Sequence, residues 1–160
     1  MTESRIEARI RELGYELPVA PAPVAAYVPA VTSGSYVYTS GQLPFVDGAL
    51  PETGKVSDSG AEGSVTPENA KKYAGICLLN ALAAVKSVIG DLDRVQRVVK
   101  VVGFVASEVN FTAQPAVING ASELLGEIFG EAGQHARSAV GVPVLPLDSP
   151  VEVEIIVEYV

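Results

Sequence analysis

The chain has 160 residues, of which 48% are hydrophobic and 19% charged. A chain of this length buries about 70% of its unfolded surface around one core, so we expect a single domain spanning residues 1–160. Eleven Lys and Arg against 19 Asp and Glu give a net charge of −8. That charge repels phosphate backbones and acidic membrane surfaces, so neither a nucleic acid nor a membrane is an expected partner.

Cysteine and histidine are nearly absent. Cys77 and His135 are the only two, so no intramolecular disulfide and no Cys/His zinc site is expected. The glycine-rich motifs that hold nucleotide phosphates are also missing. The N-terminal segment is charged, unlike a signal peptide, and no apolar run reaches about 18 residues. We therefore expect a cytoplasmic protein that uses neither a metal nor an organic cofactor.

The first elements combine a helix, an arm and a hairpin. Residues 2–13 place apolar side chains at helical spacing, which predicts a short amphipathic helix. Prolines then break regular structure, so residues 1–23 should form this helix and an extended arm. Residues 30–33 and 35–39 are rich in β-formers around a glycine and predict a hairpin. The Ser- and Gly-rich segment 47–64 predicts a loop with a mobile centre.

A long helix and a valine-rich strand follow. Thr66 and Pro67 form a helix start signal, and an apolar face continues from there to Gly90. Valines occupy both alternating faces of residues 95–106, so this strand should be covered on both sides. Helices can cover one side, and a partner subunit is a candidate for the other.

The last third of the chain completes the predicted fold. Apolar spacing predicts a second long helix at 115–129, and alternation predicts strands at 138–145 and 151–159. We therefore expect an α+β two-layer sandwich. It consists of a mixed β-sheet with two long helices on one face, plus the short N-terminal helix.

Arg137 is the first candidate functional residue, because it begins an apolar strand. A guanidinium in such a place needs an anionic partner. That partner is either an internal Glu or the carboxylate of a ligand, held by two charge-assisted hydrogen bonds. Buried charges are generally paired within the protein, so the internal ion pair is the more frequent arrangement. The residues alone leave both open.

Three glutamates alternate along one face of the last strand: Glu152, Glu154 and Glu158. Such a face is most often solvated. If a neighbouring subunit encloses it, one carboxyl acquires a raised pKa and becomes a candidate proton carrier. The pattern does not decide between the two.

Three further features are weaker. Ser40 and Gly41 follow a β-rich run and could offer hydrogen-bond donors to a small ligand, although a plain turn is more common. Cys77 lies on the apolar face of a predicted helix and is expected to be an inert, packed thiol. A Ser-His-Asp triad would need His135, but the chain has no G-x-S-x-G nucleophile elbow.

Four segments together resemble one known family. They are Tyr27, YVYTSGQLP at 36–44, HARSAVGVPVLP at 135–146 and VEVE at 151–154. These segments are similar to the YjgF/Rid family, the reactive-intermediate deaminases once labelled L-PSP endoribonucleases. The resemblance spans nearly everything after residue 24, and the N-terminal helix and long loop are similar to the longer YjgF-like subgroup. It implies a chorismate-mutase-like fold and sites in clefts between subunits.

The resemblance also implies a set of site residues. The arginine that grips the substrate carboxylate falls on Arg137, and the glutamate that positions a water falls on Glu152. The substrate-binding positions fall on Tyr27, Ser40, Gly41, Asn119 and Ala139. Deaminases of the family usually carry a cysteine where this chain has Ala139, so any role of that thiol is absent here. A contribution through the backbone carbonyl would be retained.

Hydrolytic deamination of 2-enamine or 2-imine intermediates of small amino acids, giving 2-oxo acids and ammonia, is the function that the resemblance implies. A trimeric module that binds small carboxylate metabolites without turnover is the alternative, and Ala139 motivates it. The expected ligand is a small carboxylate or an imino acid in either case. Ribonuclease activity ranks last, because the net charge is −8 and there is one histidine.

Strand composition predicts an assembly. On the strand 95–106 we expect one face to carry Val98, Val102 and Phe104 and the other to carry Val95, Val99, Val101 and Val105. Because helices cover only one face, the other exposes more apolar area than a soluble monomer usually tolerates, Tyr36 and Tyr38 included. We expect a homotrimer in which three sheets meet around an axis, with Arg137 and Glu152 in the clefts between subunits.

Overall fold

The computed structural model describes residues 2–20 and 26–160. Its elements in chain order are α1 (Arg5–Glu12), β1 (Ala30–Ser33), β2 (Tyr36–Thr39), α2 (Pro67–Ile89), β3 (Val95–Ala106), α3 (Gln114–Phe129), β4 (Ala136–Val142) and β5 (Val151–Tyr159). Short 3₁₀ turns lie at Leu92–Arg94, Gly130–Gly133 and Pro146–Asp148.

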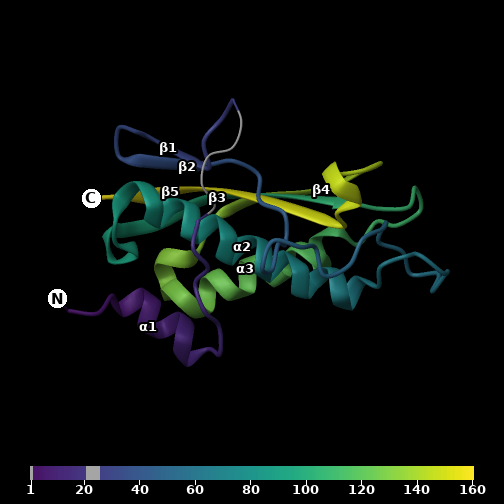
Figure 1. Ribbon diagram of the computed structural model, residues 1–160, viewed down its shortest axis with the longest axis horizontal. Helices are drawn as coiled ribbons and strands as arrows, with labels where there is room; N and C mark the ends of the chain where they lie inside the picture. The colour runs from purple at the N-terminus through teal and green to yellow at the C-terminus, as the bar shows by residue number, and fades with distance from the viewer. Residues whose placement is uncertain (1, 21–25) are drawn as a thin grey trace.

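The five strands form one mixed sheet in the order β1-β2-β5-β3-β4. Strands β3 and β4 run parallel, and every other neighbouring pair is antiparallel. Helices α2 and α3 lie side by side against one face of the sheet, and α1 lies on the far side of α3 (Figure 1). This is the predicted α+β two-layer sandwich.

Helix α2 is the central helix of the core. The Thr66 hydroxyl accepts a hydrogen bond from the Asn69 N–H at 3.2 Å, and Gly90 ends the helix with φ +86°, as the sequence signals predict. By length and composition α2 could cross a membrane, but 61% of its most apolar window is buried inside the molecule. Its hydropathy is therefore explained by its place between the sheet and α3.

Helix α1 is fixed to the fold by Asp93, in the turn before β3. The Asp93 carboxylate accepts hydrogen bonds from the Ser4 hydroxyl and from the N–H groups of Arg5 and Ile6, each at 2.9 Å. Burial alone would raise the pKa of this carboxyl, but these hydrogen bonds outweigh it and lower the pKa. The negative charge also complements the helix N-terminus, so α1 is docked at its first turn.

Strand β4 differs in its bounds from the prediction of 138–145. It begins at Ala136, because parallel pairing with β3 starts at Lys100 opposite Ala136. It ends at Val142, since Pro143 has no N–H to continue the ladder. Arg137 therefore lies inside the strand rather than before it.

The expected faces of β3 were wrong for Val98. Val98 is fully buried together with Val101 and Val105, on the face that the helices cover. The pairing with β5 shifts register between Val98 and Lys100, and this irregularity interrupts the strict alternation. Beyond it the predicted pattern holds, with Phe104 on the other face, and before it Val95 packs against the core as expected.

The loop 47–64 is anchored at its second half. Val56 and Val65 are fully buried and pair with each other, and Val56 also pairs with Ser107. The Ser- and Gly-rich residues 58–63 between them are exposed. The second half of the loop is therefore packed against the fold, and its tip is exposed to solvent.

The face of the sheet away from the helices, called here the outer face, has no cover among the described residues. Tyr36 and Tyr38 of β2 are 40% and 43% exposed on it, and Val140 of β4 is 45% exposed. Half-buried Ile156 pairs with Tyr38, and half-buried Phe104 pairs with Val140. Apolar side chains therefore share this face with Lys100 and the three glutamates of β5.

Candidate functional site

Glu152 and Gly41 lie against each other on the outer face. The backbone of Gln42 exchanges hydrogen bonds of 2.8 and 3.0 Å with Val153 of β5, which places Gly41 beside Glu152. A Cβ on Gly41 would lie 2.7 Å from Cδ of Glu152 and 2.9 Å from Oε1. Any residue other than glycine at position 41 would displace the carboxyl of Glu152.

Ser40 ties the segment around Tyr27 to the same place. Its hydroxyl donates to the carbonyl of Val28 at 2.7 Å, and its N–H donates to that of Pro29 at 2.8 Å. Tyr27 is 67% exposed beside this contact. We call Tyr27, Ser40, Gly41 and Glu152 the Glu152 group. In it, the Ser40 hydroxyl is hydrogen-bonded to the backbone, Tyr27 is exposed and Glu152 is half-buried.

Glu152 is half-buried, and its electrostatic setting is unusual for a surface glutamate. Burial raises the pKa of its carboxyl, and the negative charge of Glu154 on the same face raises it further. A carboxyl of this kind keeps its proton to a higher pH than an exposed glutamate does.

Arg137 lies on the other face of the sheet, toward α3. It pairs in register with the buried Val101 of β3. Its Nη1 donates to Oδ1 of Asn119 at 2.8 Å and to Oγ of Ser122 at 3.2 Å, both on α3. Ala139, two residues along β4, packs against the core on the same face. Arg137, Asn119 and Ala139 are called the Arg137 group.

No described Asp or Glu forms an ion pair with Arg137. Its partners within residues 2–20 and 26–160 are two neutral oxygen atoms, from an amide and a hydroxyl. Of the two arrangements that the sequence leaves open, the internal ion pair is therefore not formed by the described part of the chain. Among those residues, no carboxylate lies within ion-pair distance of the guanidinium.

The two groups do not meet within one protomer. Glu152 pairs with Phe104, which pairs with Val140, and Val140 is three residues from Arg137 on the edge strand β4. Two strand spacings and three residue rises separate their backbones by about 14 Å. The side chains also point from opposite faces of the sheet. A small ligand therefore cannot touch both side chains of one protomer.

Sequence reasoning did not identify Ser122 as a partner of Arg137, and it did not predict that Asn119 hydrogen-bonds to Arg137. Ser122 Oγ lies 2.8 Å from Nε2 of His135, and Nδ1 of His135 lies 2.6 Å from the carbonyl oxygen of Gly133. No described Asp or Glu hydrogen-bonds to His135, so the triad considered for it is not formed there. The spacing of Asn119 and Ser122, three residues apart on one helix face, was the signal that could have found the site's second hydroxyl.

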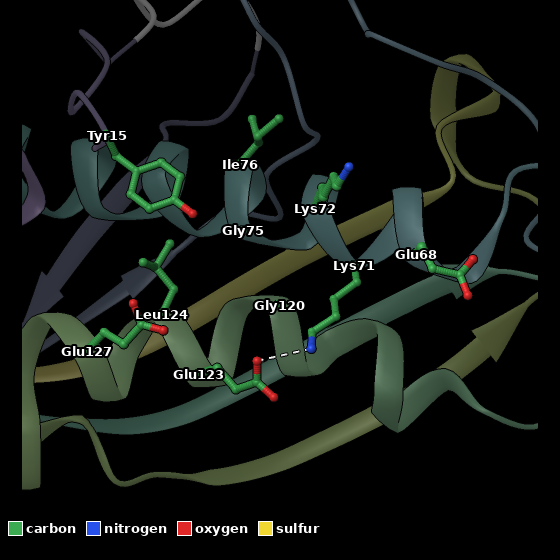
Figure 2. A pocket seen from close by; sticks show the side chains of 10 residues that line it. All are labelled: Tyr15, Glu68, Lys71, Lys72, Gly75, Ile76, Gly120, Glu123, Leu124 and Glu127. Carbon is green, nitrogen blue, oxygen red and sulfur yellow. Dashed lines mark ion pairs between the residues drawn. The ribbon is translucent and has the colours of Figure 1, made fainter. Parts of the chain in front are cut away.

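A separate groove of 580 Å³ lies between α2 and α3, beside Tyr15 of the N-terminal arm. Gly75 and Gly120 let the two helices approach, and the ammonium of Lys71 reaches Glu123 across the groove at 3.1 Å (Figure 2). None of the predicted site residues lines it. It is therefore independent of the Glu152 and Arg137 groups.

Comparisons with known proteins agree with this fold. A family model described as "YjgF/chorismate mutase-like, putative endoribonuclease" matches residues 7–159. Protein TCP17 of Trypanosoma cruzi is 44% identical over 159 residues, which cover 99% of this chain and 96% of that protein.

Two solved structures show the same architecture. Atu1372 of Agrobacterium tumefaciens, a protein described as of unknown function, is 44% identical with a TM-score of 0.87, covering 97% of this chain and 93% of that one. TdcF of E. coli with bound serine is 26% identical with a TM-score of 0.61, covering 88% and 94%. With nearly its whole length matched, the chain belongs to the YjgF/Rid family, the YjgF/chorismate mutase-like proteins.

Proposed function

We propose that the protein hydrolyses 2-imine or 2-enamine intermediates of small amino acids to 2-oxo acids and ammonia. The observation that carries this proposal is Arg137. It is half-buried and held in place by neutral oxygens of Asn119 and Ser122, with no carboxylate of the described chain to neutralise it. A guanidinium in that state is suited to a planar carboxylate, which it binds through two parallel hydrogen bonds.

Glu152 supplies the proton chemistry of the proposed reaction. As a carboxylate it takes a proton from a water molecule while the water oxygen attacks C2 of the imine. It then returns the proton to the nitrogen, which gives a carbinolamine. The carboxylate next takes the proton of the new hydroxyl group and passes it to the nitrogen. The C–N bond breaks, ammonia leaves, and the hydroxyl oxygen becomes the carbonyl oxygen of the 2-oxo acid. A carboxyl with a raised pKa is suited to both transfers, which typically contribute 10²- to 10⁴-fold. Arg137 adds positioning, because it holds the neighbouring carboxylate of the substrate.

The proposed site forms between subunits of a homotrimer. The Arg137 group of one subunit would complete the Glu152 group of the next, because within one protomer the two lie on opposite faces of the sheet. The exposed apolar side chains of the outer face, Tyr36, Tyr38 and Val140, support an interface there. Enclosure by a neighbour would exclude water and strengthen the charge interactions at the site.

A binding module without turnover is the second candidate, and Ala139 favours it. Deaminases of the family usually carry a cysteine at this position, so this chain lacks that thiol. TdcF, as its description states, has serine bound. A carboxylate ligand held by Arg137 would need no hydrolysis. The ribonuclease activity named in the description of the family is disfavoured by the net charge of −8.

The test generates 2-iminopropanoate from alanine with an amino-acid oxidase and traps it with semicarbazide. Hydrolysis by the protein should slow semicarbazone formation. Arg137→Ala and Glu152→Gln should each lower this activity at least tenfold. The first variant removes the carboxylate-binding group, and the second removes the proton carrier. Arg11→Ala and Glu12→Gln, which change exposed residues of α1, are the charge-matched controls and should behave as wild type.

Two outcomes separate the candidates. The binding module is favoured if two results occur together. Calorimetric titration shows Arg137-dependent binding of 2-oxobutyrate, and the protein does not change the decay rate of imino acids with several different side chains. Imine hydrolysis that survives Arg137→Ala would contradict the role proposed for the guanidinium.

A further inference from the structure

His135 occupies a fixed place between α3 and β4. Its Nδ1 lies 2.6 Å from the carbonyl oxygen of Gly133, and its Nε2 lies 2.8 Å from Oγ of Ser122. A carbonyl oxygen only accepts hydrogen bonds, so Nδ1 must carry a proton and donate it there. In the neutral ring Nε2 is then an acceptor, and the Ser122 hydroxyl donates to it.

The orientation of the Ser122 hydroxyl determines whether its hydrogen or a lone pair faces Arg137. Because the proton of Ser122 points at His135, a lone pair of Oγ is free to accept from Nη1 of Arg137, 3.2 Å away. Asn119 Oδ1 accepts the other Nη1 hydrogen at 2.8 Å. Both Nη1 hydrogens are thus used on α3. Within the described residues, Nε and Nη2 make no hydrogen bond, and these two nitrogens form one edge of the guanidinium plane.

We propose that Ser122 and His135 are positioning residues that hold the Nη1 end of Arg137, so that its Nε–Nη2 edge is presented to a ligand carboxylate. The proposal rests on the proposed function of Arg137 as the carboxylate-binding residue. Fixing the guanidinium before a ligand arrives lowers the entropy lost on binding. Neither residue touches the reacting atoms, so their loss should weaken binding more than it slows chemistry.

The first test reads the hydrogen bonds without any substrate. His135 is the only histidine in the chain, so its ring nitrogens can be assigned without variants in a long-range ¹H–¹⁵N spectrum. At about pH 8.5 the spectrum should show Nδ1 protonated and Nε2 bare. The Nη signals of Arg137, identified by their absence in Arg137→Lys, should be distinct and should merge in Ser122→Ala. An Nε2-protonated ring overturns the proposal.

The second test measures what the pair does for a ligand. Ser122→Ala should raise the KM for 2-iminopropanoate about tenfold and change kcat less than threefold, as expected for one lost hydrogen bond to a charged group. Ser87→Ala is the matched control. That serine lies in α2, its hydroxyl donates to Ala84 of its own helix, and its loss should leave KM unchanged. A KM for Ser122→Ala equal to that of Ser87→Ala contradicts the proposal.

Variants of His135 separate positioning from packing. His135→Leu removes the acceptor for the Ser122 hydroxyl and should raise KM about fivefold. His135→Gln can offer an amide oxygen in place of Nε2 and should restore KM to within about twofold of wild type. Equal KM values for the two variants would show that only ring volume matters, against the proposal.

Failure of the proposed function can be distinguished from failure of the positioning role proposed for Ser122 and His135. If the protein does not hydrolyse the imine, the same fold-changes are expected in the Kd for 2-oxobutyrate. If 2-oxobutyrate does not bind either, the proposed function fails while the tautomer and the Arg137 signals still decide whether the pair holds the guanidinium.

Discussion

Glu152 is the residue whose surroundings depart most from those of an ordinary surface carboxyl. Gly41 lies against it, Glu154 repels it, and the sheet removes part of its water shell. Each of these favours the protonated form. The same features that suit the carboxyl to proton transfer therefore lower the stability of the folded protein at neutral pH.

Glu152→Gln should stabilise the fold at neutral pH. Because the folded state holds this proton more tightly than the unfolded state, stability is highest below the unfolded pKa of about 4.3 and falls as pH rises through the raised folded pKa. The thermal midpoint of Glu152→Gln should exceed that of wild type at pH 7, and the difference should vanish near pH 4. Equal midpoints at both pH values, at one protomer concentration, would refute the raised pKa.

Of the two glycines at the contact between α2 and α3, Gly120 is the more tightly enclosed. A Cβ on Gly120 would lie 1.9 Å from the backbone oxygen of Lys71 and 2.8 Å from its carbonyl carbon. Neither atom is the end of a flexible side chain, so one helix would have to move. This close approach brings the two helices together in the layer that carries Asn119 and Ser122.

Gly120→Ala should therefore destabilise the protein by about 1–3 kcal/mol, as over-packing does. Gly126→Ala is the matched control in the same helix, where the added Cβ meets nothing within 4 Å. It should leave stability unchanged or raise it by up to about 1 kcal/mol, because alanine is the better helix former. Urea unfolding of the two variants compares them directly, and equal stabilities would rule out the close approach.

Elements with local signals could be predicted from the sequence. Thr66 and Pro67 start α2, a glycine ends it, and β3 and β5 have the expected bounds. Non-local effects could not be predicted. The start of β4 depends on its pairing with β3, and the register shift that buries Val98 depends on β5. Neither is encoded in a local pattern of apolar residues.

The candidate site was predictable as residue types but not as an arrangement. The motifs identify Arg137 and Glu152, yet only the sheet topology places them on opposite faces. The hydroxyl of Ser40 proved to be engaged with Val28, and Ser122 had no motif to mark it. Hydrogen-bond partners from different elements depend on the packing of α3 against β4, which sequence spacing does not define.

At the scale of the whole molecule, the uncovered outer face and the divided site lead to one account. In the proposed trimer, a neighbouring subunit covers the apolar side chains of that face, and the neighbour's Arg137 group lies beside the Glu152 group. A cyclic trimer would provide both contacts, because each head-to-tail contact joins the same two surfaces. Arg137 of one subunit and Glu152 of the next would then form each site.

Mixing two inactive variants tests this central claim most directly. Arg137→Ala and Glu152→Gln protomers, unfolded together in equal amounts and refolded, should regain about one quarter of wild-type imine hydrolysis, the share of contacts in which both intact residues meet. Each variant refolded alone should stay inactive. A mixture that stays as inactive as its components would show that the two residues do not act across a subunit boundary, and would contradict the account.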